Sequence, residues 1–299
     1  MKRRKLLKIA GLTAASALTA NCFYLSETIQ DEEMKPGAEI EGKVLCDLHC
    51  HPNKYLTTDE TADFLGSPGL VGLTQRYTSP HILTYEIAKE RLQRYNDYKE
   101  ITPGHLAKFQ DGYFARTQEV EADIHHILAI GFHGDYIPDY PNPKEAIAEI
   151  HTRSGISILN HPYSIPGGST FHIAKGKEEE RVKSLVPLVN EVEVHNAFNI
   201  NYYIFFMKQA NQLAEELIQG TGHKGVSASD CHDDIEQAKI CGIYIDKDVI
   251  ENEGIKGIQD AIKFGNFEAL KGPYISKWSF TKTMVFPRIQ RMLGLKDNL

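Results

Sequence analysis

The stretch NPKEAIAEIHTRSGISILNHP, residues 142–162, contains a complete helix-to-strand unit and decides the fold class. Asn142 provides an N-cap, Pro143 is typical of a first helical position, and Gly155 predicts the end of the helix. The apolar run ISILN that follows predicts a short buried strand. His161 stands directly at the end of this strand, so the unit also supplies a polar side chain of the kind that binds metals.

The same alternation of strands and helices continues on both sides of this unit. Strands are expected at 43–49, 69–74, 124–132, 191–196, 224–230, 241–246 and near 269–274, and helices at 81–100, 179–189, 202–219 and 254–264. Such a pattern predicts an α/β fold, either a barrel or a doubly wound sheet. Within it, the segment EITPGHLAKFQDGYFARTQ, residues 100–118, matches no simple pattern.

The composition is that of an ordinary globular protein. The chain has 299 residues, of which 41% are hydrophobic and 24% charged, enough for one large domain or two of medium size. Lys and Arg number 33 against 40 Asp and Glu, a formal net charge of -7. The overall field therefore does not favour stable binding to nucleic acid or to anionic lipid.

The N-terminus predicts an export signal over residues 1–21. MKRRKLLK is basic, and IAGLTAASALTA is apolar but too short to span a bilayer comfortably. Arg3 and Arg4 resemble the twin-arginine consensus, which implies an exported protein; the alternative is a basic, frayed helix. Cys22 follows a sequence only loosely like a lipoprotein cleavage box, which leaves a membrane tether through the N-terminus open. Residues 22–43 are expected to form a linker.

The remaining cysteines give no metal-binding or redox motif. Cys46, Cys50, Cys231 and Cys241 form no CxxC pair. They are expected to be small buried residues, although an exported chain could pair some of them.

Two histidines at the end of the first predicted strand point to a metal site. In CDLHCHP, residues 46–52, strand alternation places Asp47, His49 and His51 on one face and Leu48 and Cys50 on the other. Two imidazoles at this spacing can chelate a divalent cation, although a lone pair of this kind is equally typical of a partly buried loop.

Other predicted strands also end in residues whose side chains can bind metal ions. His161 ends one strand, Asn196 ends EVEVHN, and Asp230 with His232 repeats the spacing of the first pair in SASDCH. In a parallel barrel the carboxyl ends of the strands share one rim, where barrel enzymes place their sites. Chance can explain one such residue but hardly four strand ends.

In order along the chain, the motifs DLHCH, QEVEADIHHILAIGF, ISILNHP, VEVHN and SASDCH resemble the PHP family, named for polymerase and histidinol phosphatase. The resemblance covers about residues 44–275 and implies a metal-dependent phosphoesterase on a distorted seven-stranded β/α barrel. Residues 276–299 are then a C-terminal extension.

The resemblance implies metal-binding roles for His49, His51, Glu119, His126, His161, Asp230 and His232. His49, His51 and Asp230 would bind a first ion, Glu119 would bridge to a second, and His126 and His161 would complete the second. His232 would serve a further metal or the substrate phosphate. Glu121 and His125 are the neighbours that would take over from Glu119 and His126 in a shifted register.

Two departures from the family pattern concern a third metal. The family often has an acidic residue or histidine near Pro52–Leu56, and it usually reads Ile-Thr-Asp-His where this chain has Leu73–Arg76. The sequence therefore favours two divalent ions, with the third left open. Arg76 could replace the missing cation by binding phosphate oxygens, or it could form an ordinary salt bridge at the rim.

The expected activity is hydrolysis of a phosphomonoester or phosphodiester on a small phosphorylated compound or nucleotide. A ligand set of imidazoles and carboxylates suits Zn, Mn or Fe better than Mg or Ca. Asp47 would orient a ligand histidine, and His195 would line the pocket. The alternatives are an amidohydrolase or metal-dependent deoxyribonuclease-like barrel, and a degenerate barrel that binds metal without turnover. The oligomeric state does not follow from the sequence.

Overall fold

The computed structural model describes residues 39–285, except 78, 168–169, 203–204 and 233. The expected export signal (1–21), Cys22 and residues 22–38 of the expected linker lie outside the described residues, as do residues 286–299 of the C-terminal extension. Residues 35–274 form one compact unit. The described part of the other unit comprises a short helix, α8 (Lys277–Phe280), and a π-helix, η3 (Thr281–Val285).

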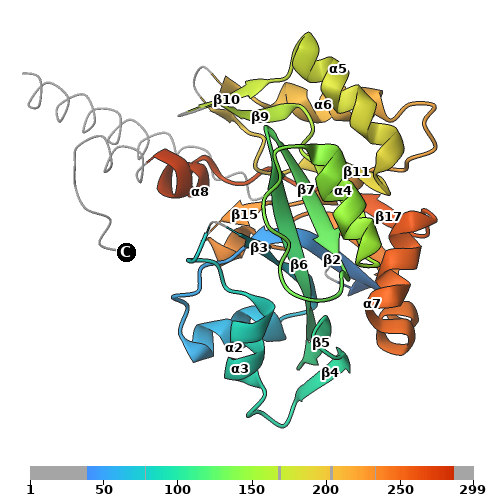
Figure 1. Cartoon of the computed structure of the whole chain (residues 1–299). Coiled ribbons are helices and arrows are strands. Elements are labelled where there is room, and N and C mark those ends of the chain that lie inside the picture. Colours follow the sequence, from blue (N-terminus) through green and yellow to red (C-terminus); the bar gives the residue numbers. More distant parts are fainter. Residues whose placement is uncertain (1–38, 78, 168–169, 203–204, 233, 286–299) are drawn as a thin grey trace, which may run out of the picture. The chain divides into compact units, whose positions relative to one another are not determined.

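A single curved sheet organises the unit of residues 35–274 (Figure 1). Its neighbouring strands are, in order, β14 (Val226–Ala228), β11 (Glu191–Asn196), β8 (Ile156–Asn160), β7 (His125–Ile130), β6 (Gly112–Ala122), β3 (Gly69–Arg76), β2 (Lys43–His51), β16 (Gly242–Asp246) and β17 (Glu268–Leu270). The first strand in this order, β14, packs against β2 and β16 near the other end. The sheet is therefore a nearly closed α/β barrel, which confirms the predicted fold class.

The barrel is distorted because the sheet is mixed. β2, β3 and β6 are parallel, and so are β8, β11 and β14. β7 runs antiparallel to both of its neighbours, β6 and β8, and β16 runs antiparallel to β2. The start of β7 consequently lies at the same rim as the carboxyl ends of the parallel strands. This rim holds the candidate site.

Smaller elements extend the sheet and its rim. β1 (Glu39–Ile40) and β15 (Cys231–His232) pair with β2, and β5 (Leu106–Phe109) joins β4 (Tyr98–Thr102) to β6. Two hairpins stand apart from the sheet, β9 (Ser164–Gly167) with β10 (Thr170–Ile173), and β12 (Asn201–Tyr202) with β13 (Phe205–Phe206).

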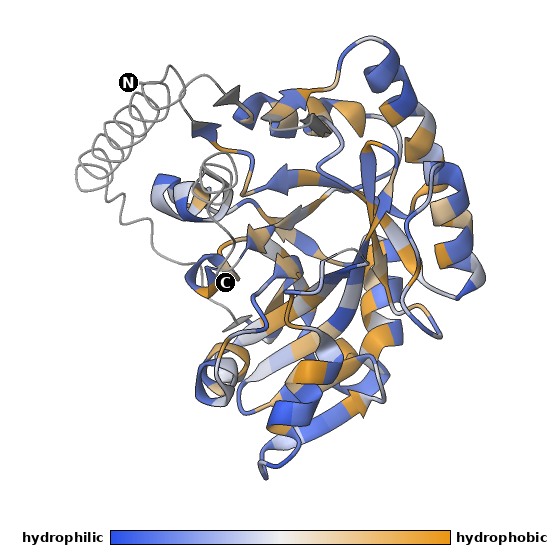
Figure 2. Ribbon diagram, turned by 60° about the vertical axis from the view of Figure 1, so that its left-hand side comes forward, coloured by the Kyte–Doolittle hydropathy of each residue, from blue (hydrophilic) through white to orange (hydrophobic). Residues whose placement is uncertain are grey.

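The helices pack around the barrel in distinct apolar clusters. They are α2 (Thr58–Gly66), α3 (Tyr85–Leu92), α4 (Pro143–Thr152), α5 (Lys177–Leu185), α6 (Lys208–Leu217) and α7 (Lys247–Lys263), with 3-10 turns η1 (Val186–Leu188) and η2 (Ile235–Gln237). One cluster joins α4, α5 and α6 to β6, β7, β8 and β11, and another joins α2 and α3 to β3, β5 and β6. The third combines strand residues such as Ile130, Ile158 and Ile243 with α7. Figure 2 shows hydrophobic and hydrophilic residues mixed along both the strands and the helices.

The unit at residues 142–162 folds as its sequence predicts. Asn142 caps α4 by accepting a hydrogen bond from the backbone N–H of Lys144, and Pro143 is the first helical residue. Ala146, Ile147 and Ile150 are the buried positions of the helix. The strand prediction is confirmed by β8, which delivers His161 to the rim.

Other predicted elements differ in extent. The helix expected over 81–100 is confined to α3, and β4 begins before residue 100 because the chain turns back to add an antiparallel ribbon to β6. The helix expected over 202–219 shortens to α6, since a small hairpin precedes it. Among the described helices, none is long and apolar enough to cross a membrane.

Candidate metal centre

The polar residues singled out in the sequence lie at one rim of the barrel. His49 and His51 are at the end of β2, Glu119 is near the end of β6, His126 is at the start of β7, His161 follows β8, and Asp230 and His232 follow β14. His126 reaches this rim because β7 runs in the opposite direction. A strictly parallel barrel would have placed its side chain at the other end.

An irregularity in β2 sets the direction of the histidine side chains. The pairing of β2 with β3 shifts register between Asp47 and Cys50, as at a β-bulge. β3 comes so close at this point that a Cβ on Gly72 would lie 2.2 Å from the carbonyl oxygen of Leu48. Only glycine leaves room there. The bulge changes which residues share a face of β2.

Asp47 therefore lies away from the position expected for it. Its carboxylate accepts hydrogen bonds from the backbone N–H groups of Ser229 (3.0 Å) and Lys239 (2.8 Å) and from the thiol of Cys50 (3.0 Å). Simple alternation placed Asp47 opposite Cys50 and beside His49. Because the bulge breaks that alternation, Asp47 ties the rim loops together, and a different carboxylate contacts His49.

The first group of ligand atoms comes from His49, His51 and Asp230, which are all buried. The Nε2 atoms of the two histidines are 3.1 Å apart. Asp230 Oδ1 lies 3.3 Å from His49 Nε2 and 3.5 Å from His51 Nε2. Three donor atoms thus converge from two strand ends.

The second group is centred on Glu119. Its Oε1 atom lies 2.9 Å from His126 Nδ1, 3.3 Å from His161 Nε2 and 3.2 Å from His49 Nε2. Its Oε2 atom lies 3.4 Å from His51 Nε2. The carboxylate therefore stands between the two groups, as a bridging ligand would.

Hydrogen bonds fix the orientation of three imidazoles. His49 Nδ1 donates to Glu193 Oε1 (3.0 Å), His51 Nδ1 to the carbonyl oxygen of Thr74 (2.9 Å), and His161 Nδ1 to that of Ser164 (3.3 Å). These partners only accept, so the Nδ1 atoms carry the protons and each Nε2 presents a lone pair when the ring is neutral. Lone pairs at such short separations need a cation between them. The donor set therefore fits divalent metal ions.

The electrostatics of the cluster favour the ligand forms of the acids. Burial opposes ionisation of Glu119 and Asp230, but the neighbouring histidines outweigh it and hold the pKa of Glu119 well below its usual range. The pKa of Asp230 is likewise lowered, through His49 and His232. Burial lowers the pKa of His51 to about 4, so this ring is neutral near pH 7.

The other two buried histidines of the cluster behave differently. Burial opposes protonation of His49 and His161, but the surrounding carboxylates outweigh it and raise the pKa of both, that of His49 well above its usual value. Without a metal ion, these two rings therefore favour their protonated forms. A metal ion would displace those protons.

Two of the candidate ligands hold unusual backbone conformations. His161 has φ 27° and Asp230 has φ 51°, a region that non-glycine residues rarely adopt. The backbone N–H of Asp230 donates to the carbonyl oxygen of His49 at 2.9 Å, which holds the loop against β2. Such conformations cluster at functional sites, where surrounding contacts maintain them.

Glu193 received no role from the sequence, and Asn196 was expected only as one of the polar strand ends at the rim. Glu193 contacts His49, and Asn196 Nδ2 donates to both Glu193 Oε2 (3.0 Å) and Asp230 Oδ2 (3.1 Å). The available signal was the acidic residue alternating with valines in EVEVHN, because an acid in a buried strand requires partners.

The remaining predicted residues lie around this centre. Arg76 forms an ion pair with Glu121, and its Nε is 3.5 Å from Glu119 Oε2. His232 lies at the edge, with Nε2 3.3 Å from Asp230 Oδ1 and its ring stacked on His51 at 4.7 Å. Glu121 therefore faces Arg76, whereas Glu119 contacts the histidines.

Two further histidines lie outside the cluster. His125 precedes His126 on β7 and is buried, and burial lowers its pKa to about 4. His195 is buried with its ring 5.1 Å from that of Tyr274, and burial likewise lowers its pKa to about 4.

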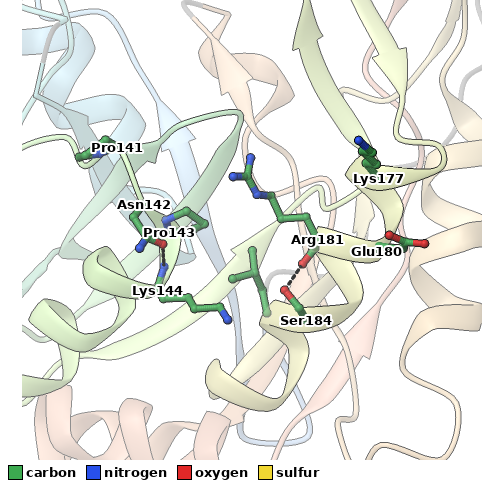
Figure 3. A pocket seen from close by; sticks show the side chains of 9 residues that line it. Pro141, Asn142, Pro143, Lys144, Lys177, Glu180, Arg181 and Ser184 are labelled. Atoms are coloured by element: carbon green, nitrogen blue, oxygen red, sulfur yellow. Dashed lines mark hydrogen bonds between the residues drawn. The ribbon is translucent and has the colours of Figure 1, made fainter.

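A cavity of about 780 Å³ lies elsewhere, between the start of α4 and α5 (Figure 3). Lys144, Lys177 and Arg181 contribute positive charge to it, and Arg181 is ion-paired with Asp123. None of the residues of the metal cluster lines this cavity.

The fold and the cluster define the chain as a mixed α/β barrel protein with two overlapping, buried groups of His, Asp and Glu suited to metal binding. No family model matches the sequence, and no curated protein matches it significantly.

The comparison with solved structures finds matches of low sequence identity. PsfC from Pseudomonas syringae is 13% identical over 85% of this chain and 97% of its own, with a TM-score of 0.48. The lesion-specific endonuclease PfuEndoQ from Pyrococcus furiosus is 15% identical over 76% and 57%, with 0.47. A two-domain protein from Bacteroides vulgatus containing a predicted PHP-like metal-dependent phosphoesterase is 14% identical over 82% and 69%, also with 0.47.

Proposed function

We propose that this protein is a metal-dependent phosphoesterase that hydrolyses a small phosphomonoester or phosphodiester at the barrel rim. The observation that carries the proposal is the convergence of histidine Nε2 lone pairs and carboxylate oxygens around Glu119, in a buried site whose imidazoles are fixed from behind. Imidazoles with carboxylates favour Zn, Mn or Fe.

The residues divide into two sets of ligands. His49, His51 and Asp230 would hold one divalent ion, His126 and His161 would hold another, and Glu119 would bridge them. Bound divalent cations supply Lewis acidity, which lowers the pKa of water and stabilises negative charge on phosphoester oxygens.

The fixed charge of Arg76 favours an anionic substrate over an amide or a lactone. The guanidinium lies beside Glu119 and is 28% exposed, so it borders both the metal ligands and solvent. A guanidinium forms charge-assisted, bidentate hydrogen bonds with phosphate oxygens. Its ion pair with Glu121 holds it in place. Arg76 would orient the phosphate group, and His232, on the open side of Asp230, would donate a proton to the leaving oxygen.

The proposal is tested with purified protein reconstituted separately with Zn, Mn and Fe. Phosphomonoesters, phosphodiesters, amides and lactones would be offered in parallel, and Asp230→Asn would serve as the inactive reference. We expect phosphoester hydrolysis that depends on metal and is lost in this variant. Hydrolysis of amides or lactones alone, or full metal occupancy without turnover, would overturn it in favour of an amidohydrolase-like or a non-catalytic barrel.

We also propose that residues 1–21 direct export of the protein from the cytoplasm. The paired Arg3 and Arg4 before a short apolar run support this assignment. Replacing both by lysine should retain the protein in the cytoplasm, as followed by cell fractionation. Unchanged export of the double variant would refute the twin-arginine assignment.

A further inference from the structure

The buried carboxylate of Glu193 contacts both halves of the metal centre. Its Oε1 atom accepts the Nδ1–H of His49 at 3.0 Å. Its Oε2 atom accepts the backbone N–H of His161 at 2.6 Å. His49 is shared by both groups of ligands and His161 belongs to the second only, so one side chain connects the shared ligand to a ligand of the second group.

Asn196 extends this connection to Asp230. Its Oδ1 accepts the backbone N–H of Phe198 at 2.9 Å, which fixes the orientation of the amide. Its Nδ2 must then face the carboxylates, and it donates to Glu193 Oε2 at 3.0 Å and to Asp230 Oδ2 at 3.1 Å. Ligands from β2, β8 and the end of β14 therefore share one pair of buried side chains.

We propose that Glu193 is a positioning residue that couples the binding of the two metal ions. An ion on His49 fixes that ring, which fixes Glu193, and Glu193 in turn holds the backbone of His161 in its unusual conformation. The second ion then finds its ligand already ordered, so binding is positively cooperative, and the coupling is reciprocal. The inference rests on the metal site of the proposed function and does not require its phosphoesterase activity.

Glu193→Gln is the sharpest probe because it keeps the shape of the side chain and changes one acceptor into a donor. The amide oxygen should take the place of Oε2, where it still accepts from His161 and Asn196. The NH₂ group would then face His49 Nδ1 and favour the tautomer with the proton on Nε2. That proton occupies the atom needed for the metal. Loss of a partner behind a metal ligand typically weakens metal binding by about 10–100-fold.

Glu191→Gln is the matched control. Glu191 is two residues earlier on β11 and equally buried, and it accepts backbone N–H groups from Val192, Lys224 and Gly225, away from the metal ligands. The substitution Glu191→Gln makes the same chemical change as Glu193→Gln, in the same strand. Any general effect of placing an amide in β11 would appear in both variants.

The experiment titrates metal-free protein with Co²⁺ in the absence of substrate, following visible absorption and bound metal per chain. We expect cooperative binding of two ions by the native chain and by Glu191→Gln. In Glu193→Gln, both affinities should fall by about 10–100-fold and the cooperativity should disappear. If Glu193→Gln lowers the affinity only for the ion at His49, or if the native chain binds its two ions independently, the coupling role is refuted.

Asn196→Asp provides a second route if Glu193→Gln fails to fold by circular dichroism. It retains the acceptor for Phe198 but turns a carboxylate oxygen toward Glu193 and Asp230, so like charges meet and the connection is broken. Cooperative binding should again be lost, and its persistence in a folded variant would overturn the proposal. If the native chain binds metal cooperatively but hydrolyses no phosphoester, the proposed function is refuted and the coupling role of Glu193 still stands.

Discussion

The two halves of the metal centre are built differently. His49 and His51 come from one strand end, and each has its Nδ1 atom held by a buried acceptor. The other half is assembled from β6, β7 and β8, and the side chain of His126 is 11% exposed, against 0% for His49. A local chelating pair that is braced from behind should therefore bind its ion more tightly than a group collected from three strands.

Removing a ligand from each half should give the largest effects. We expect His49→Ala to lower activity by more than about a hundredfold. It should also weaken the binding of both ions, because the ring of His49 contacts both Asp230 and Glu119. His126→Ala should lose mainly one ion. Elemental analysis and kcat/KM measure both.

The exposed His172, ion-paired with Glu178, supplies a His→Ala control that should leave metal content unchanged. Equal losses in the His49 and His126 variants would mean that the two halves do not differ.

Arg76 tests the contribution of the protein's own charge beside the metal ligands. Charge-assisted hydrogen bonds to phosphate contribute about 1.5–3 kcal/mol, so Arg76→Ala should lower kcat/KM for a phosphoester by roughly ten- to a hundredfold. Metal content should not change. Arg153→Ala removes an arginine paired with Glu149 on α4 and should have little effect. Unaltered kinetics in the Arg76 variant would reduce this residue to a rim salt bridge.

The two histidines of the first half should contribute differently to the pH dependence of metal affinity. The pKa of His49 is raised well above its usual value, whereas burial lowers that of His51 to about 4. Below its raised pKa, His49 keeps a proton that metal must displace, so affinity should fall as pH falls, by about tenfold per pH unit for each displaced proton. His51 adds no such competition above its pKa. Calorimetry in buffers of different ionisation enthalpy counts the protons, and a release of none would contradict this account.

Gly72→Ala should disturb the first half directly and the second half through it. The added Cβ would meet the carbonyl of Leu48 at the β2 bulge, and overpacking of this kind costs about 1–3 kcal/mol of unfolding free energy. Because His49 also contacts Glu119, and Glu193 connects it to His161, ion binding at His126 and His161 should weaken together with that at His49. Denaturant unfolding and metal titration measure the two effects. Gly104→Ala, where φ is 74° and no atom lies within 4 Å of the added Cβ, shows by comparison the cost of backbone strain without crowding.

The bulge at β2 shows where prediction from alternation fails. The sequence correctly indicated a strand ending in His49 and His51, but it could not indicate that the register shifts between Asp47 and Cys50. That shift depends on how closely β3 approaches, which is a property of the assembled sheet. Asp47 consequently contacts the rim loops, and Glu193, to which the sequence assigned no role, holds His49 instead.

What the sequence determined by itself is local. The helix cap at Asn142, the short apolar strand that ends at His161 and the paired histidines of β2 follow from side-chain chemistry and spacing within a few residues. The tertiary structure alone decided the reversed direction of β7, which brings His126 to the rim, and the buried contacts of Glu193 with His49 and His161. These depend on strand order and closure between segments far apart in the chain, which local spacing does not encode.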